Sequence, residues 1–149
     1  MPPRVAGPEP TIVMRVFPAW SIEVPATFDE TFVEEHAYWH AFDLVRSISL
    51  TSIRLSDDDG PVRAEDIVRE TRGVAGDMPG DAIADRPDGL PGWAYTANAE
   101  PGARASRLLS GGLAIDGCLL IVTITAGDLD WARATWLSIR THRPNAAGH

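Results

Sequence analysis

The last third of the chain constrains the fold more than any other segment. Two apolar runs, Leu113–Ile115 and Cys118–Thr125, flank the pair Asp116-Gly117, and an Asp-Gly pair in that setting is typical of a two-residue β-hairpin turn. Asp128 then precedes a stretch to about His142 with apolar residues at helical spacing, which predicts an amphipathic helix capped by the Asp128 side chain. A hairpin followed at once by such a helix predicts an antiparallel sheet with a helix packed on it.

Alternation of apolar and polar residues predicts further strands upstream, at Ser21–Val24, Arg46–Leu55, Trp93–Ala99 and Arg104–Leu109. The last two are joined by a predicted turn at Pro101-Gly102. The alternation slips at Ser52-Ile53, which predicts a β-bulge. Gly111-Gly112 predicts a bend or a bulge before the hairpin, because glycine in a strand often marks irregular pairing.

One helix is expected between the strand that ends near Leu55 and the strand that begins at Trp93. Pro61 opens it, it runs to about Arg72, and Gly73 is its expected C-terminal capping residue. Residues 73–92 are rich in glycine, proline and aspartate. They predict a long irregular loop, with Ala82–Ala84 as a candidate short edge strand.

Residues 28–44 admit two interpretations. As a strand, Glu34–Phe42 places four side chains on one face: His36, Tyr38, His40 and Phe42. As a helix, Thr27–Glu30 forms a capping box, and His36 and His40 stand one turn apart. The strand is favoured because tyrosine, tryptophan and phenylalanine prefer strands and a long strand follows directly.

Together these elements predict an α+β fold, an antiparallel β-sheet packed by an inserted helix and a C-terminal helix. A chain of 149 residues, of which 44% are hydrophobic, buries enough surface for one domain without a disulfide. The single cysteine, Cys118, is expected to be a small buried thiol. We expect one domain over residues 20–143, after a flexible, proline-rich lead-in (1–19) and before a loose tail (144–149).

Composition excludes several functions. The chain contains no lysine, and all 13 basic residues are arginine, so phosphate loops of the Walker type, protein kinases and Schiff-base enzymes are ruled out. The net charge of −8 and the scattered arginines argue against nucleic acids and anionic membranes as partners. With no signal-peptide pattern and no long apolar run, a cytoplasmic protein is expected. The arginine bias favours a bacterial source with a GC-rich genome.

The candidate binding residues are aromatic, namely Tyr38, Trp39, His40, Trp93 and Trp131. The first three belong to the most unusual cluster in the chain, His36–His40 preceded by Glu34-Glu35. The simplest interpretation of this cluster is a half-buried sheet face. Trp93 borders the glycine-rich loop, and Trp131 lies off the inner stripe of the C-terminal helix. A tryptophan in either position is a candidate anchor for a partner.

A metal site on His36 and His40 depends on the helical interpretation, in which the two imidazoles share one face. In an extended chain four residues span roughly 13 Å, so one ion cannot bind both side chains. No third ligand is assigned, and neither a cofactor nor a catalytic residue is expected. Asp57–Gly60 does not match the ligand spacing of a calcium loop and predicts a solvated turn.

Three segments resemble the PsbP-like superfamily, which includes the photosystem II extrinsic protein and bacterial DcrB-type proteins. Trp20–Pro25 is similar to its opening strand, and Ser47–Leu55 with the helix at Ala64 to its central strand and first helix. Asp116-Gly117, the strand after it and the helix ending at Trp136–Arg140 are similar to its closing hairpin and terminal helix. The resemblance implies binding rather than catalysis, by analogy of fold alone.

Three functions remain open from the sequence. The first is a non-enzymatic interaction module that binds a protein partner, or self-associates, through its sheet face or the Gly73–Gly92 loop. The second is a carrier of a small hydrophobic ligand, with a pocket lined by Trp136, Trp39 and Leu120. The third is a metal-dependent or acid–base enzyme that uses four side chains: His36, His40, Glu34 and Asp43.

Overall fold

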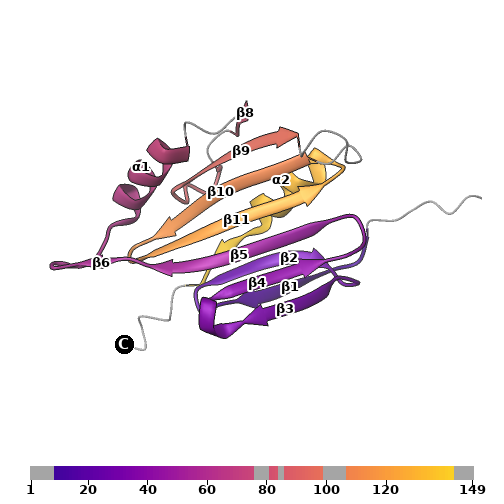
Figure 1. The fold of residues 1–149 in the computed structure, drawn as a ribbon, viewed down its shortest axis with the longest axis horizontal. Helices are drawn as coiled ribbons and strands as arrows, with labels where there is room; N and C mark the ends of the chain where they lie inside the picture. The colour runs from indigo at the N-terminus through magenta and orange to yellow at the C-terminus, as the bar shows by residue number, and fades with distance from the viewer. Residues whose placement is uncertain (1–8, 76–80, 84–85, 99–106, 143–149) are drawn as a thin grey trace, which may run out of the picture.

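The computed structural model describes residues 9–75, 81–83, 86–98 and 107–142. Its main element is a seven-stranded antiparallel sheet in the order β3-β4-β5-β11-β10-β9-β8 (Figure 1). The bounds of these strands are Asp29–Val33 (β3), Tyr38–Phe42 (β4), Ser47–Arg54 (β5), Asp81–Ala82 (β8), Gly92–Asn98 (β9), Arg107–Ile115 (β10) and Cys118–Ala126 (β11). The predicted Asp116-Gly117 hairpin joins β10 to β11 and is confirmed, with Gly117 at a φ of 80°.

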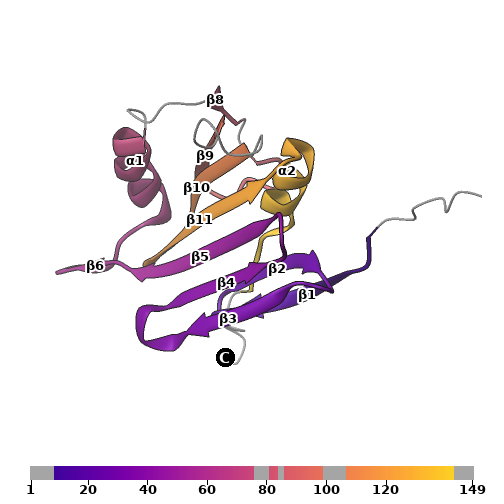
Figure 2. The same ribbon diagram turned by 45° about the vertical axis from the view of Figure 1, so that its right-hand side comes forward.

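Two helices lie on opposite faces of this sheet (Figure 2). Helix α1 (Ala64–Ala75) packs on one face through Ile67, which contacts Ala114 of β10. Helix α2 (Leu129–Ser138) packs on the other, where the Trp136 ring lies over Gly111 of the same strand. The prediction of an antiparallel sheet with an inserted and a C-terminal helix is therefore confirmed. Neither helix is long and apolar enough to span a membrane.

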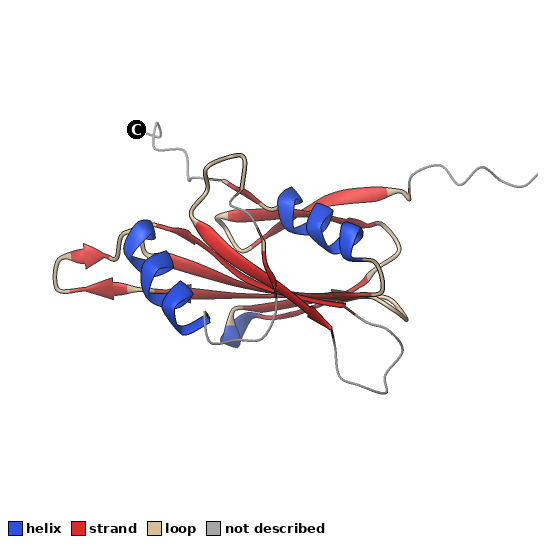
Figure 3. Ribbon diagram, turned by 90° about the horizontal axis from the view of Figure 1, so that it is seen from above, coloured by secondary structure: helices blue, strands red, loops and turns tan. Residues whose placement is uncertain are grey.

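A small second sheet lies beside α2, over the same face of the main sheet. It has the order β1-β2-β12, with β1 at Thr11–Val16, β2 at Trp20–Pro25 and β12 at Arg140–Thr141. The remaining short elements are a 3₁₀ turn, η1 (Glu34–His36), and the hairpin of β6 (Ser56–Asp57) and β7 (Gly60–Pro61). Seen from above, that hairpin projects from the sheet beyond α1 (Figure 3).

The main core fills the space between the two sheets and α2. Alternate residues of β5 and β11 point into it, and Ile48, Leu50 and Val122 are fully buried. Trp20 of β2 and Trp136 of α2 close it from the other side. A smaller apolar cluster lies under α1. The face of the sheet that carries α1 is thus covered mainly at one end.

Both ends of α2 have identifiable caps. Asp128 accepts a hydrogen bond from the Asp130 amide at 2.9 Å, which confirms the predicted N-cap. At the other end the guanidinium of Arg86 donates to the carbonyl oxygens of Trp136 and Ile139, the latter at 2.6 Å, and pairs with Asp88. Arg86 is only 6% exposed. It therefore provides the partners that the last carbonyl groups of a helix lack.

Three boundaries predicted from sequence are wrong. Thr11–Val16 was expected in the flexible lead-in but forms β1, because it pairs along its whole length with β2 and places Met14 and Val16 against the core. Helix α1 begins at Ala64 rather than Pro61, and Gly73 lies inside it rather than at its C-terminal cap. Residues 1–8, the tail 144–149 and the Pro101-Gly102 turn lie outside the described residues.

The two predicted irregularities of the strands are also absent. The pairing of β5 with β11 runs without a break past Ser52-Ile53, and that of β10 with both neighbours runs without a break through Gly111-Gly112. The two glycines instead permit close packing, because the rings of Trp136 and Trp93 occupy the space that side chains at positions 111 and 112 would fill. The segment 28–44 is extended over Tyr38–Phe42, as favoured, but Asp29–Val33 forms its own strand and Glu34–His36 a 3₁₀ turn between the two.

Candidate functional site

The outer side of β4, β5 and the adjacent part of β11 has no described element packed over it. Helix α1 packs on β9, β10 and the start of β11, which leaves this half of the sheet accessible. We term it the open face and define it by eight half-buried residues, Tyr38, His40, Phe42, Ser47, Ser49, Thr51, Thr123 and Thr125. It is a continuous surface because neighbouring strands of one sheet form it.

A row of rings runs along β4 on the open face. Tyr38 and His40 have ring centroids 6.2 Å apart, and His40 stacks on Phe42 with centroids 4.8 Å apart. Every second residue of a strand points to the same side, which is why these three rings adjoin. The pairing of β4 with β5 places a hydroxyl opposite each ring, and the Tyr38 hydroxyl lies 3.1 Å from Ser49 Oγ. The open face therefore presents apolar rings and hydrogen-bonding groups in parallel rows.

The predicted binding residues divide between this face and the interior. Tyr38 and His40 lie together on the open face, but Trp39 points the other way. It is 2% exposed, and its Nε1 donates to Glu30 Oε2 at 3.0 Å. Trp93 is half-buried at the edge of α1, where its Nε1 donates to Thr71 Oγ1 at 2.8 Å. Side chains alternate between the two faces along β4, which explains why Trp39 is in the core while Tyr38 and His40 are on the open face. Phe42, which was not among the predicted binding residues, completes the row.

Trp131 belongs to a separate cluster built around Arg46. The guanidinium of Arg46 lies over the rings of Phe28 and Trp131, 5.1 and 4.8 Å from their centroids. It also forms a two-pronged ion pair with Glu9, at 2.8 and 2.7 Å, and bonds to Asp43. The hydrogen bonds that Arg46 donates to Glu9, and the negative charges of Glu9 and Asp43, raise the pKa of Arg46. Through these contacts Trp131 helps to hold the chain near Glu9 against the β4–β5 turn. Its ring is therefore engaged within the protein rather than free to anchor a partner.

The carboxylate of Asp43 is fully engaged in this turn. Its oxygens accept from the amides of Val45 and Arg46 and from the Arg46 guanidinium. Burial acts to raise the pKa of Asp43, but these hydrogen bonds and the Arg46 charge outweigh it, so that the pKa is lowered. An engaged carboxylate of lowered pKa is a poor general base at neutral pH.

The lowered pKa of Asp43 predicts a pH-dependent contribution to stability. A depressed carboxyl pKa stabilises the folded state above the unfolded value, about 3.9, and the contribution is lost as the pH falls through the folded value. We expect Asp43→Asn to lower the free energy of unfolding by about 1 kcal/mol at pH 7 and pH 5, with the difference shrinking below about pH 4. Urea unfolding across this range measures it, and a deficit that is constant down to pH 3 contradicts the assignment.

The remaining candidates for chemistry do not converge. His36 is exposed in η1, while His40 lies in β4. Within the described ranges, no three His, Cys, Asp or Glu side chains are placed to share a metal ion. Trp136, Trp39 and Leu120, which were expected to line a ligand pocket, are all buried in the main core.

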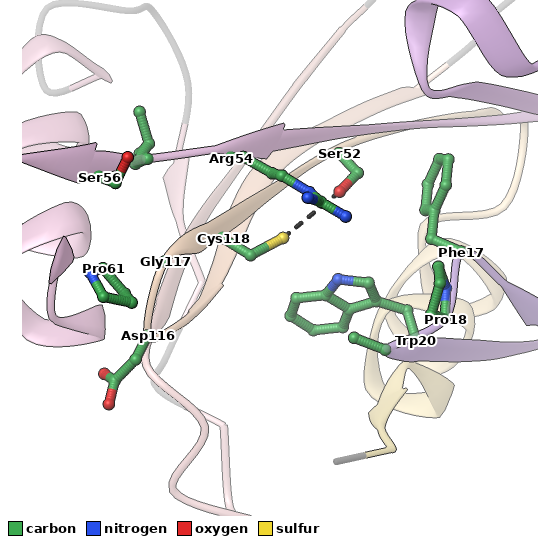
Figure 4. A pocket seen from close by; sticks show the side chains of 12 residues that line it. Phe17, Pro18, Trp20, Ser52, Arg54, Ser56, Pro61, Asp116, Gly117 and Cys118 are labelled. Carbon is green, nitrogen blue, oxygen red and sulfur yellow. Dashed lines mark hydrogen bonds between the residues drawn. The ribbon is translucent and has the colours of Figure 1, made fainter. Parts of the chain in front are cut away.

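A pocket does exist at another place that the sequence did not indicate. It lies where the β1–β2 turn meets the end of β5 and the β10–β11 turn, and its volume is about 340 Å³ (Figure 4). Trp20, Arg54 and Cys118 line it. The Cys118 thiol is half-buried rather than buried, 3.3 Å from Ser52 Oγ. These residues are far apart in sequence, and no local pattern links them.

Comparisons with known proteins support the fold and nothing finer. No protein-family model matches the chain, and no curated protein matches its sequence. The solution structure of cyanobacterial PsbP (CyanoP) from Synechocystis sp. PCC 6803 is similar, with a TM-score of 0.51 and 14% identity, over 83% of this chain and 86% of that one. A crystal structure from Bacteroides thetaiotaomicron gives a TM-score of 0.61 and 7% identity over 84% of this chain. The matched part is 46% of that protein, so this chain spans about half its length. The fold-level resemblance to PsbP is confirmed.

Proposed function

We propose that this chain is a non-enzymatic interaction module that binds a protein partner on the open face of its sheet. The observation that carries the proposal is the row of Tyr38, His40 and Phe42 beside a row of hydroxyl groups. Aromatic side chains are enriched at protein interfaces, where their rings bury area at low entropic cost and polar neighbours supply hydrogen bonds.

The partner has a surface of basic character that is complementary in shape to this sheet face, because buried contact area depends on matching shape. The net charge of −8 attracts basic surfaces at long range and supports a protein rather than a nucleic acid as the partner. The likeness to the PsbP fold adds support by analogy alone, because one fold accommodates many functions.

Affinity purification of the tagged chain from its source cells tests this proposal. We expect one protein to co-purify in a fixed ratio with the wild type. The double variant Tyr38→Asp/His40→Asp is expected to reduce its recovery at least about tenfold, as for residues at the centre of an interface. Arg133→Asp, on the exposed side of α2, is the matched control and leaves the recovery unchanged.

Two outcomes would overturn the proposal. One is equal recovery of the protein with the double variant, and the other is the absence of any protein in a fixed ratio with the wild type. Both substituted side chains are only half-buried, so the double variant is expected to keep the fold. Far-ultraviolet circular dichroism and thermal unfolding of each variant check this. If the captured protein is a second copy of this chain, light scattering on the purified chain shows a dimer.

A further inference from the structure

The pocket at the end of the sheet is separate from the open face. Ser52 and Arg54, which line it, follow Ile48 and Leu50 at alternate positions of β5 and therefore point to the core side of that strand. Its volume of about 340 Å³ lies within the range of ligand sites, about 300–1,000 Å³. At about 30 Å³ for a water-sized group, it has room for a ligand of roughly ten non-hydrogen atoms.

Trp20 presents an unsatisfied hydrogen-bond donor to this pocket. The residue is 1% exposed, and its Nε1 has no acceptor within the part of the chain that the structure describes. In contrast, the Nε1 atoms of Trp39 and Trp93 both donate to side chains. A buried donor without a partner costs about 1–3 kcal/mol and is rare in folded proteins. Among the described residues Trp136 has a second such nitrogen, but Trp136 does not line this pocket.

The Nε1 donor of Trp20 points toward Arg54, the cationic side chain that lines the pocket. Figure 4 shows the nitrogen-bearing edge of the Trp20 ring facing the guanidinium of Arg54 and the thiol of Cys118. Arg54 is exposed, and its guanidinium has no ion pair or hydrogen bond with any described residue. The acid of the lining, Asp116, is already engaged, because it accepts from the Ala64 amide at 2.9 Å and caps α1. No carboxylate within the described ranges is therefore paired with the guanidinium of Arg54.

The rest of the lining is mostly apolar. Phe17 and Pro18 come from the β1–β2 turn, and Leu55 and Pro61 from the segments that follow β5. A ligand that fits must carry oxygen acceptors and a negative charge at one end and a compact apolar body at the other. A carboxylate has this acceptor geometry, since its two oxygens accept both from guanidinium and from a second donor.

We infer that this pocket binds a small carboxylic acid with an apolar body. One carboxylate oxygen accepts from the Arg54 guanidinium and the other from Trp20 Nε1, while the apolar body lies against Phe17 and Leu55. The exposed side chain of Arg54 extends over the Trp20 edge (Figure 4), and its rotation toward the carboxylate opens that edge to the ligand. This site is independent of the partner-binding face and goes beyond the function proposed above.

Titration with benzoate, followed by nuclear magnetic resonance of the indole N–H groups, tests the inference. Benzoate is a carboxylate of suitable size, and we expect a dissociation constant on the order of 1 mM, as for a ligand with so few atoms. The Trp20 indole resonance shifts in a saturable way, whereas the resonances of Trp39 and Trp93 do not. Benzamide, which has the same shape without the charge, binds at least about tenfold more weakly.

Arg54→Gln is the matched variant, because its exposed side chain can be changed without affecting the core. It is expected to weaken benzoate binding about 10- to 100-fold, as for loss of a charged hydrogen bond. It leaves partner capture by the open face unchanged, so the two proposals fail separately. A Trp20 resonance that stays unshifted, equal binding of benzamide, or unchanged binding by Arg54→Gln would overturn the inference.

Discussion

Arg86→Met is expected to lower the free energy of unfolding by about 3–4 kcal/mol, as for the loss of two buried hydrogen bonds donated by a charged group. The guanidinium donates to three carbonyl oxygens at the end of α2, those of Trp136, Leu137 and Ile139, and forms an ion pair with Asp88. Methionine keeps most of the apolar stem but has no donor. The Trp136 carbonyl then keeps only the Ile139 amide, at 3.3 Å, and the Ile139 carbonyl only the Arg140 guanidinium, at 3.4 Å, so that each loses its shorter hydrogen bond.

Urea unfolding of the purified variant at pH 7 measures this loss. Arg133→Met is the control, because Arg133 is an exposed arginine of α2 and its replacement is expected to change the free energy of unfolding by less than about 0.5 kcal/mol. A loss below about 1 kcal/mol for Arg86→Met would show that Arg86 does not hold α2 to the chain near Asp88.

Gly111→Ala is the second large effect, with an expected loss of about 3 kcal/mol, at the upper end of the cost of overpacking. A Cβ atom at this position would lie 2.7 Å from the Trp136 ring and 2.7 Å from the carbonyl oxygen of Trp93. The ring is 2% exposed in the core and the oxygen belongs to the paired strand β9. Neither group can move away without loss of other contacts.

Gly73→Ala is the matched control for this substitution. Gly73 lies inside α1, and a Cβ atom there would meet nothing within 4 Å. Alanine is the better helix former, so this variant is expected to gain about 0.5–1 kcal/mol. Opposite signs for the two Gly→Ala variants in thermal unfolding support the packing of α2 on β10. A neutral Gly111→Ala would contradict it.

The elements that the sequence predicts correctly are those with a local cause. The Asp116-Gly117 turn, the Asp128 cap and the alternation of β5 depend on residues within a few positions of one another. Tyr38 and His40 were placed on one face by the same alternation. Each of these follows from strand or helix geometry alone.

The elements that were missed depend on contacts between distant segments. Gly111-Gly112 has the local pattern of a bend, but the rings of Trp136 and Trp93 pack on it and keep the strand regular. The prolines near the N-terminus are typical of a flexible segment, so the strand Thr11–Val16 was not predicted. Its partner, β2, begins only after a turn. The pocket between Trp20 and Arg54 arises where the topology brings two turns and the end of β5 together. The spacing of residues along the sequence does not show which distant segments the fold brings together.

Site-specific photo-cross-linking tests the central claim most directly. A photoreactive phenylalanine derivative is placed at Ser49, which lies beside Tyr38 and His40 on the open face, and in a second chain at Arg133 on the exposed side of α2. Partner binding on the open face predicts a covalent adduct with one cellular protein from position 49 and none from position 133. Adducts from position 133 alone, or no adduct from position 49, would contradict it.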